Sequence, residues 1–221
     1  MYDVILWAAI ATIVCVVFYS VLGKSVGQGP ESGFDPSNII DITGKTGEQK
    51  PQDLVDDLGF PALRDIARSD SGFTPDYFID GAKGAYSLIL EQFASGDKET
   101  LKELLTPDVY AVYAGAIDER EKNNLTQVTD LARLIDAEIV DASKTGSSAK
   151  IGVKFTSELS SALLDADGKT VEGDPDMLSR VSEVWTFERD LKSSDLNWRL
   201  SDVAPSSGDD LAADPSPDTT A

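Results

Sequence analysis

Few side chains of this sequence could support acid–base chemistry. Histidine is absent, so the commonest general base and the commonest metal ligand are missing. Glu183 is the best remaining candidate because it falls on the apolar phase of the stretch 181–187, where burial would raise its pKa and suit it to act as a base. A single acid without a second convergent group is a weak indication. We therefore expect Glu183 to reach solvent or to pair with Arg133 or Arg189.

The other motifs do not indicate metal or cofactor chemistry. The loop 165–176 (DADGKTVEGDPD) is acidic, but it lacks the Asp-x-Asp-x-Asp-Gly spacing and the twelfth-position Glu of a calcium loop. The one cysteine, Cys15, lies in an apolar run, and the sequence has no Gly-rich phosphate loop or nucleophile elbow. We predict no catalytic residue, no cofactor and no metal, and hence a binding protein rather than an enzyme. A pocket-based acid–base enzyme is the alternative.

Aromatic side chains could instead line a pocket for an apolar ligand or a partner segment. The candidates are Tyr110, Tyr113, Trp185 and Phe187, with Trp198 as a further member of the set. Such residues more often fill a core, which is the competing interpretation. We hypothesise a pocket at these residues that accepts an acyl chain or an apolar peptide.

The net charge of the chain argues against anionic partners. The chain has 39 acidic and 19 basic side chains and a formal net charge of −20. Such a surface repels phosphate backbones and anionic lipid headgroups. We therefore predict that nucleic acid is not a partner.

The segment from Val4 to Leu22 is apolar and uncharged. An α-helix needs about 20 such residues to cross the hydrocarbon core of a bilayer. Trp7 and Tyr19 lie near its ends, as interfacial aromatic residues often do. A cleaved signal peptide would need a basic start and a shorter apolar stretch that ends in an A-x-A-like site, and this segment has neither. We predict that residues 1–24 form a transmembrane anchor in contact with membrane lipid.

Basic residues indicate the orientation of that anchor. Lys24, Lys45 and Lys50 follow the apolar segment, and no Lys or Arg precedes it. Because basic residues stay on the cytoplasmic side, we predict a single-pass protein of a bacterial inner membrane whose domain faces the cytoplasm.

Two polar segments flank the predicted domain. Residues 25–52 are rich in Gly, Pro, Ser, Asp and Lys and read as a flexible linker, with a short apolar island at 38–42 (NIIDI). We expect this island to dock on its own domain, with a partner as the alternative. Residues 206–221 are acidic and contain no aromatic residue, so we predict a disordered tail. The domain itself is expected at 53–205.

Helix signals fill the first half of that domain. Two short helical pieces are expected within 54–67, broken around Gly59 and Pro61. The tripeptide Thr-Pro-Asp occurs at 74–76 and 106–108, and each copy offers Thr as N-cap and Pro at the first helical position. The first of these helices should end at Gly96, after which Asp97 should cap a short one. Three helices should therefore follow those pieces and precede residue 122.

Beyond residue 122 the apolar period changes to two, which is typical of half-buried strands. Ile135, Ala137 and Ile139 share one face of the first predicted strand. Three further predicted strands, separated by hairpin turns, complete an antiparallel meander. Strands are expected near 135–139, 151–159, 181–187 and 196–200, with breaks at 144–148, 165–176 and 191–195. Helices followed by an antiparallel meander predict an α+β fold in which the helices cover one face of a curved sheet.

Several motifs carry a resemblance to a known family. They include GAKGAY at 81–86, FASGD at 93–97, LLTPDVY at 104–110, and the pair WTFERD at 185–190 and WRLSDV at 198–203. In these pieces the sequence resembles the Tim44-like domain family over roughly residues 54–205. An apolar N-terminal helix, a tether and this domain together resemble the TimA-type membrane-anchored adaptors of alphaproteobacteria.

The resemblance implies a cone-shaped fold like that of nuclear transport factor two, with an apolar pocket at its open end. It also implies a scaffold role in which the mitochondrial member brings a heat-shock chaperone to a protein-conducting channel and contacts cardiolipin. Only a short linker stands here where mitochondrial members carry a long basic region, and the net charge of −20 disfavours anionic lipid. We therefore carry over the fold and a scaffold role at a membrane, with an unidentified inner-membrane or chaperone protein as partner.

Overall fold

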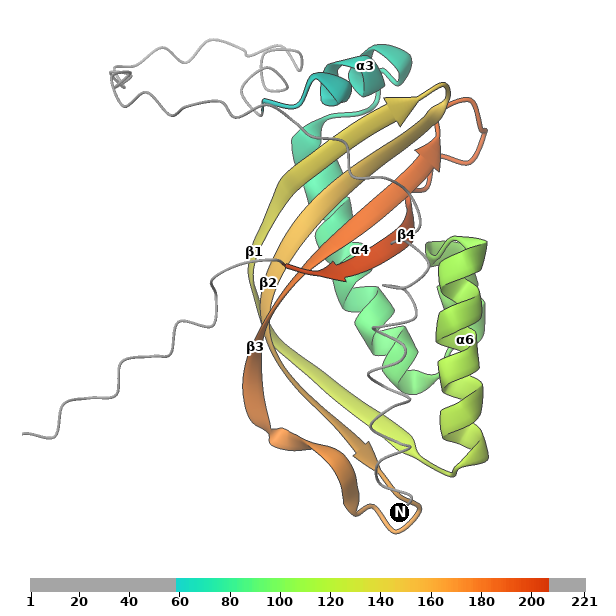
Figure 1. Cartoon of the computed structure of the whole chain (residues 1–221), viewed down its shortest axis with the longest axis vertical. Helices are drawn as coiled ribbons and strands as arrows, with labels where there is room; N and C mark the ends of the chain where they lie inside the picture. Colours follow the sequence, from blue (N-terminus) through green and yellow to red (C-terminus); the bar gives the residue numbers. More distant parts are fainter. Residues whose placement is uncertain (1–58, 207–221) are drawn as a thin grey trace, which may run out of the picture.

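The computed structural model describes residues 59–206, which fold as helices followed by a sheet (Figure 1). The elements are α3 (Pro61–Ser69), α4 (Pro75–Ser95), α5 (Lys98–Leu104), α6 (Pro107–Lys122), β1 (Thr126–Thr145), β2 (Ser148–Leu164), β3 (Thr170–Asp190) and β4 (Arg199–Pro205). The strands form one antiparallel sheet in the order β1-β2-β3-β4. The sheet is curved, and α4 and α6 lie on the same side of it (Figure 1). The predicted α+β fold is confirmed.

The limits of α4 and α5 follow from local capping chemistry. Thr74 accepts a hydrogen bond from the backbone N–H of Tyr77 at 3.2 Å, so it caps α4 as predicted. At the other end Gly96 adopts a φ of +80°, the left-handed conformation in which a helix commonly ends at glycine. Asp97 then accepts from the backbone N–H of Thr100 at 3.1 Å and caps α5.

Helix α6 begins where the second Thr-Pro-Asp predicts, but its N-cap works differently. The hydroxyl of Thr106 makes no capping bond and donates instead to the carbonyl oxygen of Leu200 at 3.2 Å. The Thr106 N–H donates to the same oxygen at 2.9 Å. Thr106 is thus the N-cap residue as predicted, but its side chain does not cap the helix, because a distant strand takes that hydroxyl and fastens the start of α6 to β4.

The strands are longer than predicted, and β1 is irregular. Strand β1 pairs with β2 along its whole length, from Thr126 opposite Leu164 to Thr145 opposite Ser148. Its register shifts between Leu131 and Arg133, between Leu134 and Asp136, and between Ile139 and Asp141. Such bulges change which side chains face the core. Leu134 consequently packs against the core while Ile135, predicted to face inward, is 37% exposed.

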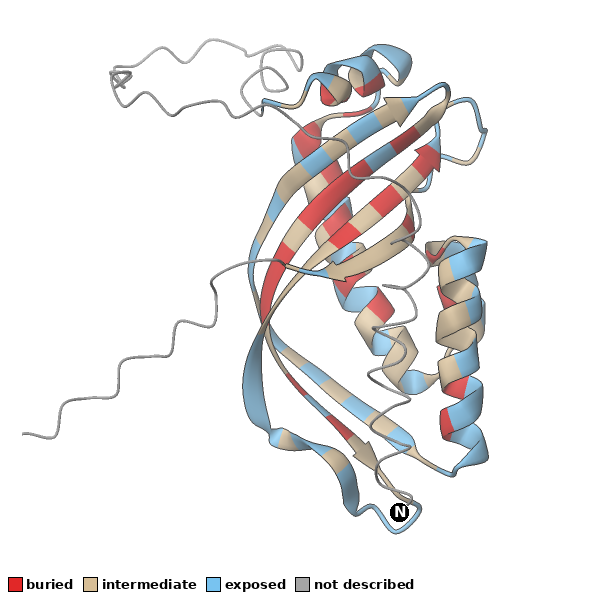
Figure 2. Cartoon of the chain, in the orientation of Figure 1, coloured by how far each residue is buried: buried red, intermediate tan, exposed pale blue. Residues whose placement is uncertain are grey.

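Buried side chains gather where α4 crosses the sheet (Figure 2). The largest of them are Trp185, Tyr86, Phe155 and Phe187. Tyr86 of α4 stacks on Phe155 of β2 with ring centroids 4.5 Å apart. This aromatic contact holds the helix against the middle of the sheet. The part of the sheet at the bottom of Figure 2, away from the crossing with α4, is mostly exposed. Met177 and Leu178 of β3 are among its exposed residues.

Some predictions fall on residues that the structure does not describe. The anchor residues Val4, Trp7, Tyr19 and Leu22, the linker 25–52 and the tail beyond Ser206 lie outside the described range. Within residues 59–206, the structure contains no helix with the length and apolar character needed to span a membrane.

A candidate partner-binding groove along α4

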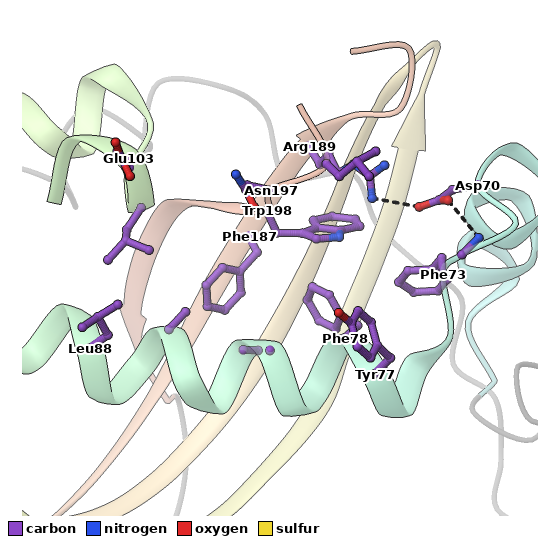
Figure 3. Close-up of a pocket in the computed structure, with 16 residues that line it drawn as sticks. Asp70, Phe73, Tyr77, Phe78, Leu88, Glu103, Phe187, Arg189, Asn197 and Trp198 are labelled. Atoms are coloured by element: carbon purple, nitrogen blue, oxygen red, sulfur yellow. Dashed lines mark hydrogen bonds and ion pairs between the residues drawn. The ribbon is translucent and has the colours of Figure 1, made fainter. Parts of the chain in front are cut away.

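A pocket of about 570 Å³ lies between α4 and the segment that leads into β4 (Figure 3). We call it the α4 groove. Its lining comes from the α3–α4 turn, one side of α4, the end of α5, the end of β3 and residues 196–198. The lining residues are Asp70, Gly72, Phe73, Tyr77, Phe78, Gly81, Ala82, Ala85, Leu88, Glu103, Leu104, Phe187, Arg189, Leu196, Asn197 and Trp198.

Aromatic rings form the floor of the α4 groove. Phe78 of α4 makes an edge-to-face contact with Trp198, with ring centroids 5.0 Å apart, and another with Phe187 of β3 at 6.0 Å. Phe73 adds a tilted contact to Trp198 at 6.1 Å. These contacts join α4 to β3 and to the residue that precedes β4. The floor is therefore a packed surface that keeps its shape.

The rim of the groove exposes large apolar side chains to solvent. Tyr77 is 77% exposed, Leu196 is 68% exposed and Leu88 is 36% exposed. Single exposed apolar residues are ordinary, whereas several around one concavity are typical of a binding surface. The site is therefore suited to an apolar occupant.

Charged groups lie at the two ends of the groove. Figure 3 places Glu103 and Leu88 at one end and Asp70 and Phe73 at the other. At the second end Arg189 donates through Nη1 to Asp70 at 2.8 Å, and the Arg189 side chain is only 7% exposed. The buried Nε of Arg189 has no hydrogen-bond acceptor among residues 59–206. Buried donors of this kind are rare and call for an explanation.

Glu183, the sequence-derived candidate for a base, lies apart from this groove, on β3. Burial raises the pKa of its carboxyl, while a 3.1 Å hydrogen bond from the Trp185 indole N–H partly opposes that shift. Of the two expected outcomes for Glu183, the ion pair is not formed, because Arg133 pairs with Glu158 at 2.8 Å and Arg189 pairs with Asp70, while Glu183 itself is partly exposed. Glu183 is held by the indole N–H of Trp185 rather than by a cation.

The neighbours of Glu183 add no second group ready for proton transfer. Burial, and then the charge of Glu183, raise the pKa of the Tyr113 phenol, which therefore stays protonated. Burial also raises the pKa of Tyr86, whose hydroxyl lies 2.8 Å from the Ser157 hydroxyl. Over residues 59–206 there is no cluster of three metal-ligating side chains.

The four predicted pocket residues are placed in different surroundings. Phe187 lines the α4 groove. Trp185 lies beside it on β3, with ring centroids 6.5 Å apart, but is 2% exposed and packs against Tyr86. Tyr113 of α6 makes an edge contact with Phe93 at 5.0 Å. Tyr110, also on α6, is partly buried against the core.

Sequence reasoning missed most of the groove. Tyr77 and Leu88 fall off the apolar phase of their helix, so the periodicity did not select them. Leu196 was assigned to the last predicted strand, but it lies before β4 and is exposed. One signal could have indicated the groove: an apolar residue that lies outside the buried face of the helix and close to an interior glycine such as Gly81. Trp198 was in the wider aromatic set and proves to lie in the floor.

The chain is similar to a known family and to individual relatives. A family described as "Tim44-like domain" matches residues 61–205. The human "Mitochondrial import inner membrane translocase subunit TIM44" is 28% identical over 158 residues, which cover 67% of this chain and 34% of that protein. The Caenorhabditis elegans "Probable mitochondrial import inner membrane translocase subunit tin-44" is 31% identical over 121 residues, covering 52% and 28%. This chain thus spans about a third of the length of these relatives.

A solved structure of a putative dehydratase from the NTF2-like family of Streptomyces avermitilis overlaps with a TM-score of 0.32 and 20% identity. The overlap covers 60% of this chain and 98% of that one. It adds nothing to the fold described above.

Proposed function

This chain belongs to the Tim44-like domain family, and from that premise we propose that it acts as a membrane-anchored adaptor. The adaptor holds a partner protein at an inner membrane during protein translocation or membrane-protein assembly. The names of the human and nematode relatives, both subunits of an inner-membrane translocase, support this assignment. The partner is an inner-membrane or chaperone protein that the adaptor brings to the site of transport.

The domain plan belongs to the same proposal. Residues 1–24 anchor the chain in the bilayer through lipid contacts, and residues 25–52 tether the domain at 53–205. Residues 206–221 form an acidic tail. The chain is a single-pass protein of a bacterial inner membrane, of the TimA type found in alphaproteobacteria, with its domain in the cytoplasm. A reporter fused after Leu22 that is active only in the periplasm would contradict this orientation.

The α4 groove is the observation that carries the proposal. It lies within the family-matched residues, has an aromatic floor and exposes Tyr77, Leu88 and Leu196 along its rim. An adaptor needs such an apolar surface and a tether that lets it reach a partner. Binding rather than catalysis is the proposed activity, because the charged groups of the groove lie at its two ends and do not converge on one point.

Photo-crosslinking in cells tests the adaptor function. A photoreactive residue replaces Tyr77 or Leu196 in the full-length chain, and the adducts are identified by mass spectrometry. The matched control carries the probe at Leu178, which is 53% exposed on β3 and does not line the groove. We expect a translocation or membrane-insertion component at the first two positions and not at Leu178. Capture of lipid or a metabolite alone would contradict the adaptor function.

An apolar-ligand carrier is the second candidate function. The groove volume of about 570 Å³ is within the range of small-molecule pockets, and the lining is mainly apolar. A carrier predicts that the chain retains a lipid or metabolite after purification. Native mass spectrometry of the chain, with and without extraction by organic solvent, distinguishes the two candidates.

A further inference from the structure

Strand β3 has an open edge in its first half. Strand β4 pairs with β3 only from Glu183 to Glu188, and the last bond on that side joins the Ser206 N–H to the carbonyl oxygen of Ser182 at 3.1 Å. Within residues 59–206 no strand covers that side of β3 before Ser182, and the lower part of β3 extends beyond β4 in Figure 1. An open strand edge presents unpaired N–H and C=O groups that another strand can bind.

A bulge in this edge exposes apolar side chains. Residues 175–178 of β3 stand opposite Ser160 of β2 alone, so they project from the ladder. Met177 is 61% exposed and Leu178 is 53% exposed. Bulges, prolines and charged residues commonly protect an edge from pairing. An edge that only avoids contact has no reason to expose two adjacent large apolar side chains, so the bulge is suited to contact another chain.

The charges around Leu178 match a second copy of this chain. Asp176 and Arg180 lie two positions before and two positions after Leu178, so in extended backbone the three side chains share one face. Both charged side chains are exposed, and neither forms an ion pair within residues 59–206. Antiparallel pairing of two copies about Leu178 places Asp176 opposite Arg180 of the second copy at both ends. Parallel pairing would place like charges opposite one another, which is unfavourable.

The backbone of this segment supports the same pairing. The carbonyl oxygen of Ser182 points to the open side, because it accepts from the Ser206 N–H. Residues 179–183 pair regularly with β2, and positions two apart in such a strand direct their N–H and C=O groups to the same side. Arg180 therefore offers its backbone groups to the open edge. Pro175, which has no N–H, and Ser182, which β4 already uses, bound the part of β3 that can pair.

We propose that two copies of the chain associate through residues 176–180 of β3, paired antiparallel with Leu178 on the two-fold axis. Asp176 of each copy forms an ion pair with Arg180 of the second copy. Five residues on each side form a small interface, so we expect a weak and reversible dimer. None of these residues lines the α4 groove, so the dimer presents two grooves. On the proposed adaptor function, two linked grooves bind a partner more tightly than one does.

Charge reversal tests the pairing. Self-association of the full-length chain in detergent micelles is measured by sedimentation equilibrium over a concentration series. Asp176→Arg and Arg180→Asp each place like charges opposite one another, and each variant alone should associate at least about tenfold more weakly than the unmodified chain. A mixture of the two variants has opposite charges at both ends of the segment. The mixture should therefore associate within about threefold of the unmodified chain.

A charge reversal elsewhere is the matched control. Glu119→Arg makes a comparable change on the exposed side of α6 and should leave self-association unchanged. Circular dichroism checks that each variant is folded. Equal association of all variants, or a mixture that associates no better than its two components, would overturn the proposal. An unmodified chain that stays monomeric throughout the concentration series would overturn it as well.

A cysteine tests the register. In a Cys15→Ser background, Leu178→Cys brings two thiols to one antiparallel pair, whose Cα atoms about 5.5 Å apart suit a disulfide. We expect mild oxidation to give a covalent dimer. Val171→Cys is the control, because Val171 is also exposed on β3, at 47%, but its two copies would lie more than about 40 Å apart in this register. Equal dimer yields at the two positions would overturn the stated register.

Other occupants of the open edge give distinct results. A photoreactive residue in place of Leu178 should crosslink to residues 176–180 of a second copy. Crosslinking within one chain to residues 207–221 would assign the edge to the chain's own tail and overturn the proposal. Capture of a different protein without self-association would assign the edge to a partner strand and overturn it too. Failure of the in-cell crosslinking at Tyr77 and Leu196 would refute the adaptor function and leave the dimer standing.

Discussion

The guanidinium of Arg189 donates a 2.8 Å hydrogen bond to the carboxylate of Asp70, 119 residues earlier in the chain. Asp70 follows the last residue of α3, and Arg189 is the penultimate residue of β3. The arginine side chain is 7% exposed and the aspartate side chain 19%. This pair fixes the α3–α4 turn against the sheet and thereby forms one end of the α4 groove.

Removing Asp70 should therefore destabilise the domain. Asp70→Ala leaves a buried guanidinium without its counter-charge, and we expect the free energy of unfolding to fall by about 3 kcal/mol. Urea denaturation of the full-length chain in detergent, followed by circular dichroism, measures it. Asp65→Ala is the control, since Asp65 pairs with Arg68 on the exposed face of α3 and should contribute less than about 0.5 kcal/mol. Similar losses of unfolding free energy in the two variants would show that the Arg189–Asp70 pair stabilises the domain no more than an exposed pair does.

Arg120 should be sensitive even to a conservative change. It donates through Nη2 to the carbonyl oxygens of Phe93 at 2.9 Å and Ala94 at 3.1 Å, and through Nη1 to Gln127 at 2.8 Å. The guanidinium thus joins α6 to the C-terminal end of α4, where a cation is favourable. Lysine cannot reproduce this forked geometry.

We expect Arg120→Lys to lower the free energy of unfolding by about 2 kcal/mol, measured by thermal unfolding. Arg68→Lys, on an exposed arginine, should leave the midpoint nearly unchanged. If the Arg120 variant unfolds at the same temperature as the unmodified chain, the contacts to Phe93 and Ala94 do not stabilise the α4–α6 junction.

Local signals predicted the helices well, because capping depends on residues a few positions apart. Thr74, Gly96 and Asp97 mark helix ends where the sequence places them. Strand length was underestimated because it depends on pairing with a distant partner. Thr126 belongs to β1 only because Leu164 lies opposite it. The bulges of β1 then moved Ile135 away from the core, which a strict period of two does not anticipate.

The site was harder to predict than the fold. Phe187 was identified from its strand phase, but the groove exists because α4 meets residues 196–198, more than a hundred positions later. The partner of Arg189 likewise depended on packing between distant elements: Glu183 was one expected partner, whereas Asp70 is the residue in contact. Exposed rim residues such as Tyr77 carry no periodic signal. A concave surface is a property of the assembled elements, and no single segment encodes it.

Glu183 should make stability depend on pH. Burial raises its pKa above the ordinary value of 4.5, so the folded state holds the proton more tightly than the unfolded chain does. Stability should consequently fall as pH rises from about 4.5 to the folded-state pKa, and then level off. Glu183→Gln keeps an oxygen acceptor for the Trp185 indole and removes the titrating group.

We expect the Gln variant to gain stability relative to the unmodified chain as pH rises from 4.5 to 7.5, measured by urea denaturation at several pH values. Glu158→Gln serves as control, because the Glu158 carboxylate is held by the guanidinium of Arg133 rather than by an indole. A pH profile unchanged by Glu183→Gln would mean that the carboxylate is solvated in the folded state.

Two glycines with nearly the same backbone conformation allow a matched test of packing in β3. Gly173 has a φ of +74° and Gly168 a φ of +77°, so alanine is strained at either position. A Cβ at Gly173 would lie 2.2 Å from the carbonyl oxygen of Ser161 on β2, whereas one at Gly168 meets nothing within 4 Å. We expect Gly168→Ala to cost about 1 kcal/mol and Gly173→Ala about 3 kcal/mol or more, because the second variant must also push β2 and β3 apart. Urea denaturation gives both values, and hydrogen exchange of the amides around Ser161 should rise in the Gly173 variant alone. Equal costs at the two glycines would mean that β3 shifts freely at this point and that its pairing with β2 there is loose.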